Sequence, residues 1–259
     1  MKKEFVSTVS TITVEEYKPI KNIVIVHGAF ADASGWEPVY KILSNDGYNV
    51  SLVQNPLTSL EDDVVATERI IDRQDGPVIL VGHSWGGAVI TQAGLSYKVS
   101  CLVYVAAFVP EEGETILALA TATPPAPENG ILPPDANGFI YYDKTKFHAG
   151  FAAEQSAEKS DFMFASQAPV AARAFVTPIT KAAWRTKPSY AIVATEDKSI
   201  DPETERMMYK RAGSKVTEIK GSHTLFISNA EAVAEVIKTA AIVTAKEKRA
   251  FTRKSAMNI

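Results

Sequence analysis

The sequence predicts an α/β fold in which helices cover both faces of a mostly parallel sheet. Two observations lead to this class. Short apolar runs that are rich in β-branched residues alternate with segments whose apolar residues recur at helical spacing. Glycines and cap-forming residues mark the boundaries between these segments. Strands that alternate with helices in this way imply a parallel sheet wound on both faces.

The first strand and the first helix are expected at residues 22–28 and 34–47. The run NIVIVHG is apolar, contains β-branched residues and ends at a glycine, which is typical of a buried strand. In SGWEPVYKILSNDG the apolar residues recur at helical spacing, with Ser34 as a cap and Gly47 as a stop.

The same alternation continues through the first half of the chain. YNVSLV is predicted as a strand, and the helix after it begins with a Ser59 cap, has an acidic first turn and ends at Gly76. The remaining elements of this half are the strand PVILVG (77–82), the helix GGAVITQAGLS (86–96) and the strand VSCLVYVAA (99–107).

Residues 110–187 break the alternation. This stretch contains the proline-rich run TPPAPENGILPPDANG, followed by the helical patterns FHAGFAAEQS and DFMFASQAPVAARAF. So long an interruption inside a compact domain usually marks an inserted lid or cap. We therefore expect one domain over residues 1–259, with a helical cap inserted at 110–187.

Strands and helices alternate again after the insertion. SYAIVAT (189–195) and KVTEIKG (215–221) are predicted strands, separated by the helix PETERMMYKRAG, and a last helix is expected over residues 229–245. The tail KEKRAFTRK is basic, but a short charged tail is more often solvated than a binding patch.

The overall composition excludes several classes of protein. The 259 residues are 46% hydrophobic and 22% charged, with a net charge of −3 and no basic stripe, so a nucleic-acid partner is not expected. No apolar run approaches ~18 residues, which argues against a membrane span. The N-terminus does not resemble a signal peptide, so a cytoplasmic location is the default expectation. The single cysteine, Cys101, lies in an apolar run and is expected to be a buried structural thiol.

The stretch GPVILVGHSWGGAVI carries the candidate nucleophile. It contains the pattern G-x-S-x-G, centred on Ser84, at a predicted strand-to-helix turn. Gly82 and Gly86 lack the bulk that would hinder so tight a turn, and Gly87 lets the helix pack close to the sheet. Such a turn raises the Ser84 hydroxyl to the N-terminus of a helix, where developing negative charge is favoured.

Serine needs a base, and the chain offers four histidines. His27 precedes Gly28 and is expected to shape that turn. His83 is adjacent to Ser84, and neighbours on a sharp turn point apart. His148 lies in the insertion, as a surface or pocket residue. His223 follows the last predicted strand, in a loop that can reach the serine, and is the expected base.

The acid that orients the base is expected in IVATEDKSIDPE, which offers Glu196, Asp197 and Asp201. Asp201 directly precedes Pro202, the first residue of the next predicted helix, and therefore suits an N-cap. Asp197 lies at the strand exit and is the preferred acid, with Asp201 as the alternative.

An oxyanion site requires two N–H donors near Ser84. The residue after the nucleophile, Trp85, should supply one donor. The loop after the first strand, HGAF, should supply the other from Ala29, with Phe30 as the alternative. The side chains of Trp85 and Phe30 either wall the substrate pocket or belong to the core.

Several of these stretches resemble the α/β-hydrolase superfamily, and within it the small bacterial esterase-like members. They are VHGAFADASGW, LVGHSWGGAVIT, LVYVAAFVPEEGE, VATEDKSIDPE and GSHTLFISNAEAVAEVI. The group is also similar to plant methylesterases and hydroxynitrile lyases. The resemblance implies an α/β-hydrolase fold with an eight-stranded, mostly parallel sheet and a helical cap. It further implies a Ser84–Asp197–His223 triad and oxyanion donors at Ala29 and Trp85.

The predicted function is therefore a serine hydrolase that cleaves small carboxylic esters without metal or organic cofactor. The Phe- and Met-rich insertion suggests an apolar acyl or alcohol group, and Phe30 and His148 are candidate substrate contacts. Two alternatives stay open: a cofactor-free lyase of the hydroxynitrile-lyase type, and a small-molecule receptor on the same fold. The oligomeric state is not predicted.

Overall fold

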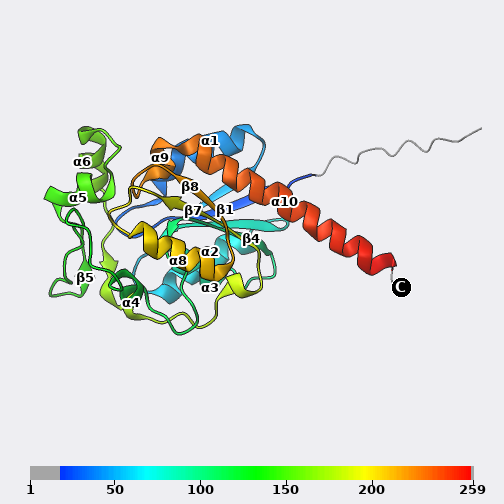
Figure 1. Cartoon of the computed structure of the whole chain (residues 1–259), viewed down its shortest axis with the longest axis horizontal. Helices are drawn as coiled ribbons and strands as arrows, with labels where there is room; N and C mark the ends of the chain where they lie inside the picture. Colours follow the sequence, from blue (N-terminus) through cyan, green and yellow to red (C-terminus); the bar gives the residue numbers. More distant parts are fainter. Residues whose placement is uncertain (1–17, 258–259) are drawn as a thin grey trace, which may run out of the picture.

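The computed structural model describes residues 18–257 and contains a parallel six-stranded sheet with strand order β2-β1-β3-β4-β7-β8 (Figure 1). Its strands are β1 (Asn22–Val26), β2 (Asn49–Val53), β3 (Val78–Ser84), β4 (Val99–Ala107), β7 (Ser189–Ala194) and β8 (Lys215–Ile219). All six strands that the residue pattern predicts are present. The eight-stranded sheet that the resemblance implies is not found in residues 18–257, where the main sheet has six strands.

Helices cover both faces of this sheet, as the α/β class predicts (Figure 1). One face packs against α2 (Leu60–Asp72), α3 (Gly86–Ala93) and α8 (Pro202–Ala212), and the other against α1 (Glu37–Asn45), α9 (Leu225–Ser228) and α10 (Ala230–Met257). Successive residues of β1 alternate between the two cores: Val24 and Val26 belong to one, Ile23 and Ile25 to the other. Central strands buried on both faces explain the continuous apolar runs of the sequence.

The last helix is longer than the sequence analysis expects. It was predicted to end at residue 245, but α10 continues through the basic tail to Met257. Lys, Glu, Arg and Ala are good helix formers, and no Gly or Pro interrupts this stretch. Lys248 in this extension donates a hydrogen bond to the Ser100 hydroxyl at 2.6 Å. No helix within residues 18–257 is both long and apolar enough to cross a bilayer.

The inserted segment (residues 110–187) lies between β4 and β7 and forms short elements at one end of the sheet (Figure 1). The predicted helical pattern over 161–175 is divided, because Pro169 and the strand after it separate α6 from α7. A short antiparallel pair, β5–β6, was not expected. The elements are α4 (Ile116–Ala120), β5 (Phe139–Ile140), α5 (Lys144–Phe151), α6 (Ala157–Ala165), β6 (Val170–Ala171), α7 (Ala172–Val176) and a 3-10 turn (Ala183–Arg185).

One buried carboxyl connects α2 to the turn that follows β3. Ser59 caps α2, since its hydroxyl accepts the Asp62 N–H at 3.0 Å. On the same helix Asp63 is fully buried, and its two oxygens accept the Leu57 N–H at 2.8 Å and the Trp85 indole N–H at 2.7 Å. Burial raises the pKa of Asp63 to about 6, and this outweighs the opposite effect of its two N–H donors.

We predict that Asp63→Ala lowers the free energy of unfolding by about 3 kcal/mol, because each buried donor left without a partner costs ~1–3 kcal/mol. Urea unfolding followed by circular dichroism would measure this loss. Glu61→Ala is the matched control: Glu61 is exposed in the same helical turn, so its removal should change stability by less than about 0.5 kcal/mol. Equal losses in the two variants would contradict the anchoring role of Asp63.

The raised pKa of Asp63 also predicts a pH dependence of stability. Above pH 3.8 this carboxyl ionises in the unfolded chain, whereas the folded protein keeps the proton up to about pH 6. The folded state therefore loses stability relative to an Asp63→Asn variant as the pH rises through this window, by about 3 kcal/mol in total. Urea titrations of both proteins from pH 4 to pH 7 would test this, and a constant difference between them would refute it.

Candidate active site

Ser84 ends β3 in a strained backbone conformation. Its φ is +52°, in the left-handed region that non-glycine residues rarely adopt. Trp85 then turns the chain into α3. A Cβ atom at Gly82 would lie 2.5 Å from the Gly86 carbonyl oxygen, and one at Gly86 would lie 2.5 Å from the Val26 carbonyl oxygen. Only glycine fits at either position, so the sharp turn at Ser84 depends on both.

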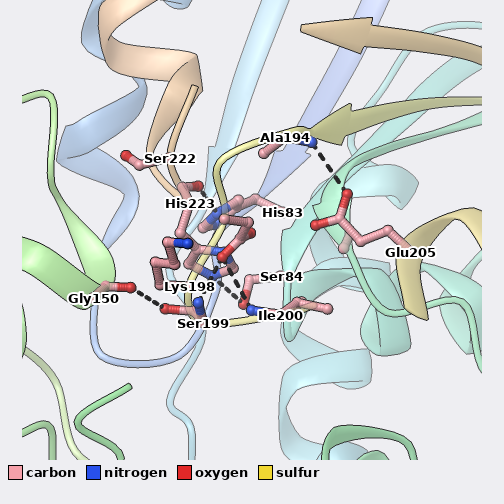
Figure 2. Close-up of polar contacts among 12 residues, drawn as sticks. His83, Ser84, Gly150, Ala194, Lys198, Ser199, Ile200, Glu205, Ser222 and His223 are labelled. Carbon is pink, nitrogen blue, oxygen red and sulfur yellow. Dashed lines mark hydrogen bonds and ion pairs between the residues drawn. The ribbon is translucent and has the colours of Figure 1, made fainter. Parts of the chain in front are cut away.

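Ser84, His223 and Asp197 form a continuous hydrogen-bond chain at the carboxyl ends of the strands. The Ser84 Oγ lies 2.8 Å from His223 Nε2 (Figure 2). His223 Nδ1 lies 2.6 Å from Asp197 Oδ2. All three side chains are buried, with Ser84 the most exposed at 7%. A carboxylate only accepts, so Nδ1 carries the ring hydrogen and Nε2 is left to accept the serine proton.

The neighbouring acids have separate positions. Asp197 Oδ1 accepts the backbone N–H groups of Ser199 and Ile200 at 2.7 and 3.0 Å, which leaves Oδ2 directed at His223. Asp201 is the N-cap of α8 and accepts the Glu203 N–H at 3.2 Å. The structure therefore brings Asp197, and not Asp201, to the histidine.

Two backbone N–H groups are available beside Ser84. Ala29 and Trp85 line the same small cavity as Ser84 and His223. Neither residue donates its backbone N–H to another backbone group among the turn and loop contacts of residues 18–257. The alternative donor, Phe30, lines this cavity as well and has φ +59°, a second strained residue at the site.

His27 holds the loop that carries Ala29. Its Nε2 accepts the Asn55 N–H at 2.9 Å, so its Nδ1–H donates to the Gly28 carbonyl at 2.8 Å. The Asn55 side-chain amide donates in return to the His27 carbonyl. Burial lowers the pKa of His27, which keeps the ring neutral, as this arrangement requires.

His83 supports the loop of His223 from behind. Its Nε2–H donates to the His223 carbonyl at 2.9 Å (Figure 2). Its ring packs against Trp36 and Phe226. Complete burial and the neighbouring His223 lower the pKa of His83 well below its usual value. The ring is therefore a neutral support, and it does not contact the Ser84 hydroxyl by any hydrogen bond in the described chain.

The cavity at Ser84 is small, about 40 Å³, and it adjoins a larger apolar chamber of about 740 Å³. The two spaces share four lining residues: Ala120, Ile131, Phe175 and Ser199. The chamber is lined by prolines, aliphatic residues and a few uncharged polar groups. Within residues 18–257, no group of three or more His, Cys, Asp and Glu side chains is arranged to hold a metal ion.

Of the two predicted substrate contacts, Phe30 and His148, only Phe30 lines the cavity at Ser84. Phe30 lines the Ser84 cavity, as do Phe151 and Phe175 of the inserted segment. His148, however, is exposed on α5 and its ring contacts the Gln155 carbonyl at 2.9 Å, outside this cavity. It lies one residue past the buried Phe147 on α5 and faces solvent.

Two buried acids at the site were missed by the sequence analysis. Asp63 holds the Trp85 indole, and Glu205 lies beside Asp197. Both stand at helical spacing with apolar neighbours, Asp63 with Leu60 and Glu205 with Met208. A charged residue on the apolar face of a helix was the available signal.

Comparison with known proteins agrees with this architecture. A carbendazim hydrolyzing esterase from Nocardioides sp. (strain SG-4G) is 33% identical over 119 residues, which are 40% of this chain and 49% of that esterase. The match therefore spans about half the length of that relative. Among solved structures, a pyrethroid hydrolase from Sphingobium faniae JZ-2 has a TM-score of 0.71 at 22% identity, over 85% of this chain and 97% of the other.

A plant enzyme has the same fold. A methylesterase from Arabidopsis matches with a TM-score of 0.68 at 19% identity, over 84% of this chain and 98% of the other. Finally, a sequence model of the alpha/beta hydrolase family matches residues 23–236, which is most of the 259 residues. This protein therefore belongs to the alpha/beta hydrolase family.

Proposed function

We propose that this protein is a carboxylic ester hydrolase with Ser84 as the nucleophile, His223 as the base and Asp197 as the orienting acid. One observation supports this above all: the Ser84–His223–Asp197 chain, at 2.8 and 2.6 Å, opens onto a cavity that Ala29 and Trp85 also line. Serine is a weak nucleophile unless a base takes its proton, and this contact provides that base.

The proposed mechanism has an acylation and a deacylation step. The Ser84 Oγ attacks the ester carbonyl while His223 Nε2 takes its proton, and Asp197 stabilises the imidazolium that forms. The N–H groups of Ala29 and Trp85 would bind the oxyanion, each typically worth ~10²–10³ in turnover. His223 then protonates the leaving alcohol and activates water, which releases the acid and restores Ser84.

The substrate is proposed to be an uncharged ester with an apolar group. The narrow cavity admits the reacting carbonyl, and the adjoining chamber of about 740 Å³ is of a size typical for small-molecule ligands. No lysine, arginine, aspartate or glutamate lines the chamber in the described part of the chain. An apolar acyl or alcohol group would therefore be accepted without an unpaired buried charge.

The alternatives receive less support. A lyase of the hydroxynitrile-lyase type often needs a lysine or a polar cap residue above the serine. Neither Lys144 nor Lys146 lines the Ser84 cavity, and among the insertion residues that line it only Tyr142 is polar. Lys146 instead donates to the carbonyls of Pro127 and Asn129. A receptor without catalysis would not require the complete hydrogen-bond chain at Ser84.

We expect Ser84→Ala to lower kcat/KM for p-nitrophenyl acetate and butyrate by about 10³-fold or more, since no nucleophile remains. Steady-state and burst kinetics on the wild type and the variant would measure this, with thermal unfolding to verify that both are folded. Full activity in the variant would contradict the nucleophile, and no turnover of any ester by the wild type would favour the receptor.

A second comparison tests the acid. Asp197→Asn should lower kcat by about 10⁴-fold, because the amide favours the wrong tautomer of His223. Asp201→Asn should stay within about threefold, because asparagine is an equally good N-cap. Both substitutions replace a carboxylate with an amide of the same shape, and the two residues lie four positions apart. Each variant is therefore the control for the other. Similar losses, or the reverse order, would overturn the assignment of Asp197.

A further inference from the structure

A second buried carboxyl lies behind Asp197. Glu205, in the first turn of α8, is fully buried. Its Oε2 accepts the Ala194 N–H at 3.2 Å, at the end of β7 (Figure 2). The Ala194 carbonyl in turn accepts the Asp197 N–H at 3.1 Å. Its other oxygen, Oε1, is buried and accepts no hydrogen bond from any donor in the described chain. Most buried polar side-chain atoms in folded proteins form a hydrogen bond, so this unpartnered oxygen is unusual.

The charged groups around Glu205 do not neutralise it. The adjacent Arg206 is directed outward and binds Glu203 and Glu218. One turn further along α8, the Tyr209 hydroxyl accepts the Ala107 N–H and lies 3.5 Å from the Ile192 carbonyl. Among residues 18–257, no lysine or arginine forms an ion pair with Glu205 or Asp197.

Two buried carboxyls side by side cannot both stay ionised. Asp197 is the better stabilised anion, because it accepts two backbone N–H groups and the His223 ring. Glu205 accepts only one N–H. Burial, followed by the charge of Asp197, raises the pKa of Glu205 well above its usual value.

We propose that Glu205 is a positioning residue that remains protonated at neutral pH and donates its hydroxyl hydrogen to the Asp197 carboxylate. This role rests on the proposed function of Asp197 and adds to it. The donated hydrogen bond holds the carboxylate in the orientation that His223 requires. It also adds no negative charge beside the imidazole.

The decisive variant is Glu205→Gln, which should fold because the amide oxygen still accepts from Ala194 and the amide nitrogen still donates to Asp197. We expect kcat/KM for p-nitrophenyl butyrate within about threefold of wild type and an unchanged acidic limb of the pH–rate profile. If Glu205 were ionised, this substitution would remove a negative charge near His223 and shift the acidic limb to lower pH. That result would overturn the proposal.

Glu205→Met removes the donor without adding charge. Its kcat should fall by about 10-fold, a typical effect of losing one hydrogen bond to a charged group. The acidic limb should move to higher pH, because a less stabilised Asp197 carboxylate makes His223 more basic. Glu203→Gln, on the same helix but 77% exposed at its side chain, is the matched control and should change neither quantity.

A measurement without substrate separates this proposal from the proposed function. Infrared difference spectra at pH 7 between the wild type and Glu205→Gln should show a protonated carboxyl band that only the wild type has. Its absence would overturn the proposal even in an active esterase. Its presence in a protein that cleaves no ester would refute the esterase function and leave the protonated Glu205 in place.

Discussion

The arrangement of the site depends on one hydrogen bond, between the Ser84 hydroxyl and His223 Nε2 at 2.8 Å. This bond forms only because Ser84 adopts φ +52° at the end of β3, a strained conformation for a residue with a side chain. Gly82 and Gly86 allow the neighbouring backbone to approach within the distance that the turn requires. The parallel sheet then brings the ends of β3, β7 and β8 to the same edge, where three loops meet.

A layer of buried polar contacts holds these loops in place. His27 and His83 each bind a backbone carbonyl, and burial keeps both rings neutral. Asp63 fixes the residue after the nucleophile from one side of the sheet, and Glu205 lies behind the acid. The two imidazoles orient the loops without adding a buried charge to the site. The reacting groups are thus surrounded by residues whose contribution is orientation.

Much of the fold could be predicted from the sequence, because strands buried on both faces give unmistakable apolar runs. The four inner strands of the described sheet are such runs, whereas the edge strands β2 and β8 are more exposed, and the G-x-S-x-G pattern marks the turn at Ser84. The N-cap position of Asp201 also followed from its place before Pro202. Features that depend on tertiary contacts were not predicted: which of the two positions left open for His148, surface or pocket, the fold gives it, the β5–β6 pair, and the contacts of Asp63 and Glu205. A single sequence does not reveal which side of a short helix faces the site.

The most direct test of the central claim is the rate at which a fluorophosphonate labels the protein, with the adduct located by mass spectrometry of the peptides. If His223 activates Ser84, the wild type forms one adduct at Ser84, and His223→Ala labels slower by about 10³-fold or more. An adduct at another residue, or equal labelling of the wild type and His223→Ala, would contradict the claim that this hydrogen bond makes Ser84 a nucleophile.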